Sequence, residues 1–145
     1  MNKVIAVLSF VSLSCFASEP QSSYQFSVGV GHQYAGLLGA QLSYKSEFTK
    51  YYGSLGLIGI SAGFETRFEE NPKHSYGLVL GREQVQSEDG FIFATYNYHF
   101  NGFDQEGFVI GAGVGITRED EGGSWGNYGK TESSAALSLN LGYKF

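Results

Sequence analysis

The sequence contains three fragments of motifs that could carry chemistry, and each lacks a part that its chemistry requires. Gly59-Ile60-Ser61-Ala62-Gly63 matches the G-x-S-x-G nucleophile elbow, which needs a turn from a strand into a helix to expose the serine, but residues 64–68 read as a continuing strand. Gly129-Lys130-Thr131 ends like a phosphate-binding loop, yet Ser124 occupies the position of its first glycine. The alternating glycines of residues 111–115 have the wrong spacing for a dinucleotide fold. We therefore expect no catalytic nucleophile and no nucleotide site.

The metal ligands and charges point to no other chemical site. His32, His74 and His99 are too scattered along the chain to predict a metal centre. The chain carries 9 Lys+Arg against 14 Asp+Glu, a net charge of −5, so it has no electrostatic basis for binding nucleic acid. We expect no metal, no cofactor and no nucleic-acid partner.

The first residues have the pattern of a secretory signal peptide. A short basic start, Met1-Asn2-Lys3, precedes an apolar run over residues 4–11, and small residues stand at Cys15 and Ala17. We expect cleavage after Ala17, which leaves residues 18–145 as a single domain without cysteine. Cys15 as a lipidated residue is the alternative, but that reading expects leucine where Ser12 stands.

The composition of the chain indicates β-structure in a membrane. Charged residues make up 16%, against about 25% in ordinary soluble domains, while Gly (21), Tyr (10) and Phe (12) are abundant. Eight segments read as strands of the length that a tilted strand needs to cross an outer membrane. They are residues 24–31, 38–45, 50–57, 60–68, 74–83, 91–100, 108–117 and 133–145. The predicted fold class is all-β, an eight-stranded antiparallel up-and-down transmembrane β-barrel, which requires a tight turn over residues 56–59.

The two faces of these strands differ in a way that suggests which one meets lipid. One face carries bulky apolar residues such as Leu42, Leu80 and Val114, and the other carries glycine and serine. Glycine and serine would be a poor outer coat in water, but they suit the narrow interior of an eight-stranded barrel. A soluble eight-stranded binder of the lipocalin type is the structural alternative.

The predicted interior also holds charged residues, which are costly to bury unless they are paired. We expect a polar plug of salt bridges and hydrogen bonds, and not a general pore. Its predicted members are Lys45, Glu65, Arg67, His99 and Lys144.

The last strand alternates up to the final residue. Apolar side chains share one face of this strand, and they are Leu137, Leu139, Leu141, Tyr143 and Phe145. This ending resembles the closing strand of bacterial outer-membrane β-barrels, in which a terminal Phe is the membrane insertion signal. The whole chain resembles small eight-stranded barrels of the OmpX and OmpA-transmembrane-domain type. The resemblance implies a monomer in the bacterial outer membrane, inserted by the outer-membrane assembly machinery and in contact with lipid and lipopolysaccharide.

If Phe145 lies in the periplasm, the even number of strands places the mature N-terminus there too. The long connector over residues 118–130 then lies outside the cell. Outer-loop contact residues are then Asp120, Glu121, Trp125 and Tyr128, while Arg82 and Arg118 would meet lipopolysaccharide phosphates. Aromatic residues fall near the periplasmic strand ends, as expected for a membrane-interface girdle. They are Tyr24, Phe26, Tyr44, Phe68, Tyr76, Tyr98, Phe100, Phe108, Tyr143 and Phe145.

We expect a structural or surface-interaction role for such a barrel. The alternative is a lipid-A-modifying enzyme. The outer-membrane deacylase family places a His and a Ser two residues apart, but none of the three histidines here is followed by serine at that spacing.

Overall fold

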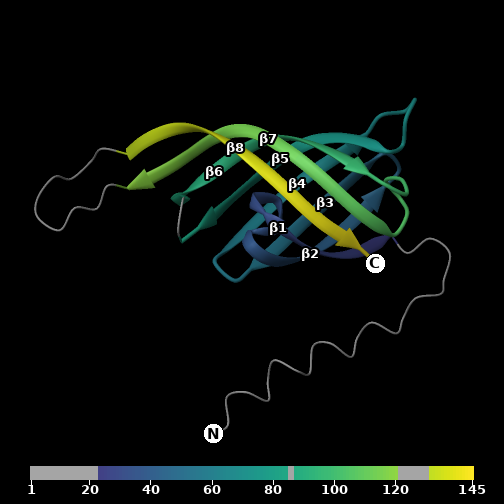
Figure 1. The fold of residues 1–145 in the computed structure, drawn as a ribbon, viewed down its shortest axis with the longest axis horizontal. Coiled ribbons are helices and arrows are strands. Elements are labelled where there is room, and N and C mark those ends of the chain that lie inside the picture. The colour runs from purple at the N-terminus through teal and green to yellow at the C-terminus, as the bar shows by residue number, and fades with distance from the viewer. Residues whose placement is uncertain (1–22, 85–86, 121–130) are drawn as a thin grey trace, which may run out of the picture.

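The computed structural model describes residues 23–84, 87–120 and 131–145, and all of its strands belong to one closed β-barrel (Figure 1). Each strand pairs antiparallel with its sequence neighbour, and the last strand pairs with the first. The strands are β1 (Tyr24–Gly31), β2 (Gly36–Ser46), β3 (Thr49–Gly56), β4 (Gly59–Arg67), β5 (His74–Glu83), β6 (Ser87–His99), β7 (Gly107–Asp120) and β8 (Thr131–Lys144). The predicted all-β, eight-stranded, up-and-down barrel is therefore confirmed, including the tight turn between Gly56 and Gly59.

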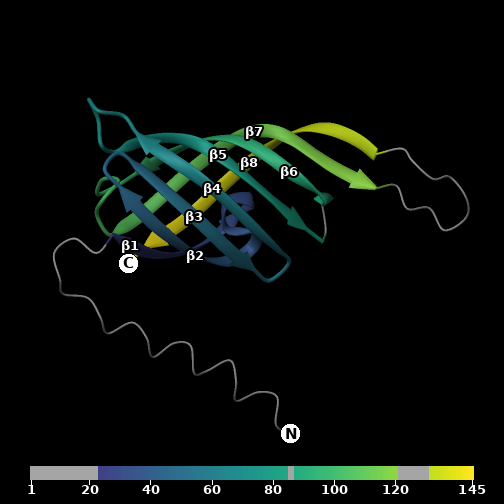
Figure 2. The same ribbon diagram turned by 180° about the vertical axis from the view of Figure 1, so that it is seen from behind.

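The two ends of the barrel differ. We call the end where β1 begins and β8 stops the termini end, and the opposite end the loop end. β7 and β8 pair along their whole length, from Gly107↔Lys144 to Asp120↔Thr131, whereas β1 and β8 pair only from Ser27↔Lys144 to Val30↔Leu141. The β7–β8 hairpin consequently projects past the other strands at the loop end (Figures 1 and 2).

Strand alternation sorts the side chains between the interior and the outer wall. The serines and glycines of the predicted inner face are buried or half-buried, and the bulky apolar residues of the predicted outer face are exposed, apart from the half-buried Phe64. Among the residues whose burial is described, buried polar or charged residues are more than twice as numerous as buried hydrophobic ones. Four of the buried hydrophobic residues, Tyr52, Val79, Phe91 and Phe93, pack together in one small cluster.

The β1–β2 connection folds into the barrel, where Gln33 and Tyr34 are buried. A single 3-10 turn, η2 (His32–Tyr34), follows Gly31, whose φ of 102° favours glycine, and ends at Ala35 in the left-handed conformation. Tyr34 is 1% exposed. A side chain on Gly29 would lie 2.7 Å from the Tyr34 ring, so the glycines of β1 and β8 leave the space that this ring fills.

Candidate functional site: a plugged interior and an apolar outer wall

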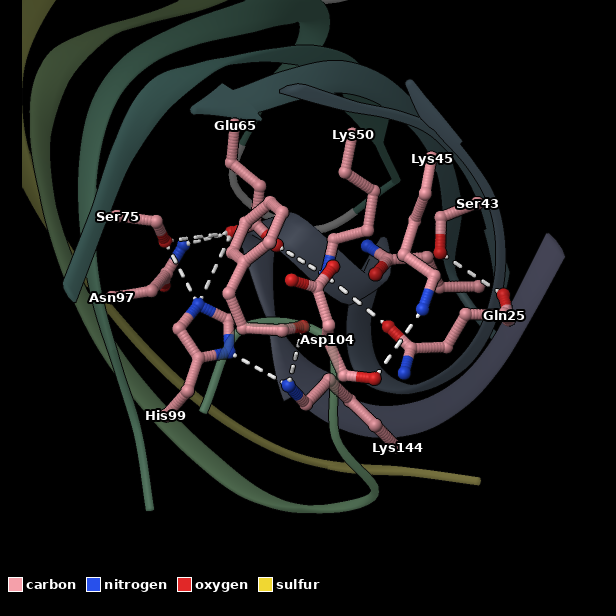
Figure 3. Close-up of polar contacts among 12 residues, drawn as sticks. Gln25, Ser43, Lys45, Lys50, Glu65, Ser75, Asn97, His99, Asp104 and Lys144 are labelled. Carbon is pink, nitrogen blue, oxygen red and sulfur yellow. Dashed lines mark hydrogen bonds and ion pairs between the residues drawn. The ribbon is translucent and has the colours of Figure 1, made fainter. Parts of the chain in front are cut away.

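A charged cluster fills the interior near the termini end and is centred on Glu65 of β4 (Figure 3). Its members are Lys50, Glu65, His99 and Lys144. Glu65 Oε1 lies 2.5 Å from Lys50 Nζ of β3, and both side chains are almost completely buried. Glu65 Oε2 accepts hydrogen bonds from Asn97 Nδ2 at 2.7 Å and Ser75 Oγ at 3.2 Å. The only carboxylate of this cluster is thus paired and hydrogen-bonded on both oxygens, which is the condition for burying a charge at tolerable cost.

Lys144 of β8 connects this cluster to the β6–β7 connection. Its Nζ donates to the carbonyl oxygens of Gly102 at 2.8 Å and Phe103 at 3.0 Å, and it lies 3.0 Å from His99 Nδ1. These contacts use all the protons of one ammonium group. Lys144 therefore ties the closing strand to the segment that covers the termini end.

Phe103 closes the termini end over the cluster. The residue is 1% exposed, its ring centroid lies 4.6 Å from Lys50 Nζ, and it forms a T-shaped ring pair with His99. Phe103 N donates to the Pro72 carbonyl at 2.7 Å, which ties this segment to the β4–β5 connection. The described contacts therefore close the interior at this end with protein groups.

Ser75, His99 and Glu65 are in mutual contact, but their hydrogen bonds run in the wrong direction for a nucleophilic triad. Since the Lys144 ammonium donates to His99 Nδ1, the network assigns the ring proton to Nε2, which lies 2.8 Å from Ser75 Oγ. His99 then donates to Ser75, whereas an activating base must accept the serine proton. Both residues are fully buried as well. We assign this arrangement a packing role.

At the loop end, η2 is held inside the barrel by polar contacts from four strands. The Gln33 carbonyl accepts from Ser54 Oγ at 2.8 Å, Ser61 Oγ at 3.1 Å and Gln41 Nε2 at 3.4 Å. Gln33 N donates to Asn140 Oδ1 at 3.0 Å. Ser61, the serine of the G-x-S-x-G fragment, therefore lies on a strand and anchors η2 inside the barrel.

His32 of η2 and Glu83 of β5 form a second polar contact at the loop end. His32 Nε2 lies 3.8 Å from Glu83 Oε2, and His32 Nδ1 lies 3.0 Å from Ser138 Oγ. The His32 ring packs on Phe93 and forms a T-shaped ring pair with Phe91. Ser138 is 2% exposed, so this serine has no path to a substrate in the described arrangement.

The residues that the sequence proposed for the plug separate into two groups. Glu65, His99 and Lys144 belong to the charged cluster. Lys45 is half-buried at the rim, where its Nζ donates to the Asp104 carbonyl at 3.4 Å. Arg67 is also half-buried, and its guanidinium lies over the Phe48 ring at 4.8 Å. Both residues therefore lie beside the cluster and not in it.

Lys50, Tyr34 and Phe103 are central to this interior, but they were not predicted from the sequence to lie inside. A usable signal existed for Lys50, because it stands two and four residues before Tyr52 and Ser54 and so shares their inward face. Tyr34 and Phe103 lie in connections, to which the period-2 rule does not apply.

The apolar side chains of the closing strand lie on the outer wall. Leu137 and Leu139 are 81% and 78% exposed, Leu141 and Phe145 are about half exposed, and Tyr143 is half-buried. Of the proposed outer-loop contacts, Asp120 is the last residue of β7 and pairs with Thr131. Glu121, Trp125 and Tyr128 lie outside the described residues.

Aromatic rings cluster around the outside of the termini end. Ten residues contribute these rings, and we call them the aromatic girdle. They are Tyr24, Phe26, Tyr44, Phe68, Tyr76, Tyr98, Phe100, Phe108, Tyr143 and Phe145. Neighbouring rings touch across strand pairs, with centroids 5.3 Å apart for Tyr24–Tyr44, 5.0 Å for Phe68–Tyr76, 5.0 Å for Phe108–Tyr143 and 5.9 Å for Phe26–Phe145. The last of these contacts joins the two strands that close the barrel.

No protein-family model matches the chain, and no curated protein or solved structure is detectably similar to it. Among the described residues, no helix is long and apolar enough to cross a membrane. The same part of the chain contains no group of three or more His, Cys, Asp or Glu side chains that could hold a metal ion.

Proposed function

We propose that this protein is a small integral β-barrel of the bacterial outer membrane, with a plugged polar interior and a structural or surface-interaction role. The observation that carries the proposal is the inverted distribution of side chains, with charged and polar groups inside and large apolar groups outside. A soluble barrel of the lipocalin type needs the opposite distribution. Soluble monomers rarely expose contiguous apolar patches larger than a few hundred Å².

The energetic reason lies in the exposed outer wall. Each Å² of apolar surface removed from water stabilises a protein by about 25 cal/mol. In water, side chains such as Leu42, Leu80 and Val114, all more than half exposed, would forgo that stabilisation around the whole barrel. In a bilayer the hydrocarbon chains cover the same side chains, and the pairing of β1 with β8 closes the sheet on itself.

The aromatic girdle supports the proposal and suggests an orientation. Amphipathic rings favour the interface between membrane and water. With the girdle at the periplasmic interface, Phe145 and the start of β1 lie on the periplasmic side, as the insertion-signal hypothesis requires. The loop end with the projecting β7–β8 hairpin then faces outward, where it would contact lipopolysaccharide or another surface.

Cell fractionation tests the proposal. We expect the tagged protein in the outer-membrane fraction, with faster gel migration when the sample is not heated, because a folded barrel stays compact in detergent. A product recovered in the soluble periplasm, with the same migration before and after heating, would overturn it.

The plugged interior predicts a closed lumen. In planar bilayers the purified barrel should give no steady, large conductance, because η2 fills the loop end and Phe103 covers the termini end. A double substitution of Phe103 and Tyr34 to alanine removes a buried ring at each end and should raise the conductance. Steady, large openings of the unmodified protein would contradict the plug.

A further inference from the structure

The outer wall carries very few positive charges, and the two that the structure describes lie in one row. Among strand residues with described side chains, Arg82 of β5 and Arg118 of β7 are the only exposed Lys or Arg. The remaining basic strand residues, Lys45, Lys50, Arg67 and Lys144, are buried or half-buried. Outward-facing cations are therefore confined to one sector near the loop end.

The register places β6 between these two arginines. Gly90 of β6 pairs directly with Arg118. On its other side, β6 pairs with β5 through Gly81↔Phe91 and Glu83↔Ser87, so Arg82 lies opposite the bulged residues that end at Gly90. Adjacent strands are about 4.8 Å apart, which puts the two arginine Cα atoms about 10 Å apart. Gly90 has no side chain, so at this residue β6 places no group between the arginines, and the exposed Asp89 lies beside it in the same bulge.

The next row toward the termini end is apolar. Leu80, Ile92 and Ile116 pair across β5, β6 and β7, and each is about half exposed. In the proposed orientation the arginines therefore stand at the outer edge of the apolar wall, where lipid headgroups begin. Arginine binds phosphate through paired N–H donors, and basic side chains at a membrane boundary reach toward the headgroups.

We propose that Arg82 and Arg118 form a clamp, open over Gly90, for the phosphate groups of a phosphorylated glycolipid of the lipid A type in the outer leaflet. This inference rests on the proposed membrane function and names a lipid partner for the outer wall. Arg82 and the exposed Asp89 also make contacts within the protein. A guanidinium carries several N–H donors, so such a contact and a phosphate can share one arginine.

Lipid retention by the purified barrel tests the clamp. Native mass spectrometry of the detergent-solubilised protein would measure retained bis-phosphorylated lipid A for the wild type and for Arg82→Gln/Arg118→Gln. We expect retention to fall about tenfold in the double variant, since every 1.4 kcal/mol of lost binding corresponds to a factor of ten. Lys73→Gln, which removes an exposed cation at the opposite end, should retain lipid A as the wild type does.

Two further arms identify the ligand. Lipid A without its phosphates should be retained as poorly by the wild type as intact lipid A is by the double variant, and phosphatidylglycerol should not displace intact lipid A. Equal retention by the wild type and the double variant, equal retention of both lipid A forms, or displacement by phosphatidylglycerol would overturn the clamp. Heat-modifiable migration of each variant verifies that the barrel has formed. A chain that never enters lipid refutes the proposed function itself, whereas a lipid-embedded barrel indifferent to the phosphates refutes only the clamp.

Discussion

Replacing Glu65 with glutamine is expected to destabilise the barrel by about 3–5 kcal/mol, the range for breaking a buried ion pair from one side. The change removes the negative charge that faces Lys50 at 2.5 Å and leaves Lys50 and Lys144 buried without an opposite charge in the cluster. The free energy of unfolding, measured by urea titration in lipid vesicles, is the quantity to compare. Glu69→Gln, an exposed carboxylate in the β4–β5 connection, should leave it within about 0.5 kcal/mol of the wild type.

A compensating variant separates charge from packing. Replacing both partners with apolar residues of similar length, Glu65→Leu with Lys50→Met, leaves Lys144 as the one buried lysine of the cluster without an opposite charge, whereas Glu65→Gln leaves two. This double variant should therefore be more stable than Glu65→Gln. If Glu65→Gln unfolds at the same urea concentration as the wild type, the cluster does not hold the barrel together.

Adding a single methyl group at Gly142 is expected to dislodge η2, which fills the loop end. A Cβ at this position of β8 would overlap the Tyr34 hydroxyl and lie 2.9 Å from the ring atom Cε2. Overpacking of this kind costs about 1–3 kcal/mol, and the readouts are urea stability and conductance in planar bilayers. We expect Gly142→Ala to be less stable than the wild type and to open more often.

Gly53 offers a matched control for this substitution. It also lies within a strand, and an added Cβ there meets no atom within 4 Å. Gly53→Ala should therefore leave both stability and conductance unchanged. In a Tyr34→Leu background, Gly142→Ala should cost less than in the wild type, because residues in contact show non-additive effects. Equal costs in the two backgrounds would show that Tyr34 does not fill this space.

The strands were predictable because side-chain alternation has one period along the whole barrel. β1 and β5 occupy the predicted residues, and the tight turn lies between Gly56 and Gly59 as expected. β6 and β7 extend farther toward the loop end than the predicted segments, over Ser87–His99 and Gly107–Asp120. The extra residues are polar and carry no alternating apolar signal, so only the pairing of the strands with one another defines their ends.

The plug was harder to predict because tertiary contacts decide it. Gln33 and Tyr34 stand in a short connection whose sequence is polar and aromatic. They are buried only because groups from distant strands, such as Ser54 and Asn140, converge on Gln33. Phe103 likewise follows a strand end, and its position depends on Lys144, forty-one residues later in the chain. Such contacts between distant residues cannot be predicted from the local sequence pattern.

The central claim is that the apolar outer wall faces lipid, and site-directed fluorescence quenching tests it most directly. Single cysteines would replace Leu42, Leu80 and Val114 on the wall and Glu69 in the β4–β5 connection, with Cys15 changed to serine. Each would carry a small fluorophore, and the protein would be measured in bilayers. We predict that brominated lipid chains quench the wall positions while aqueous iodide quenches the Glu69 position. Iodide quenching of the wall positions to the same extent as the Glu69 position, with no effect of brominated lipid, would contradict it.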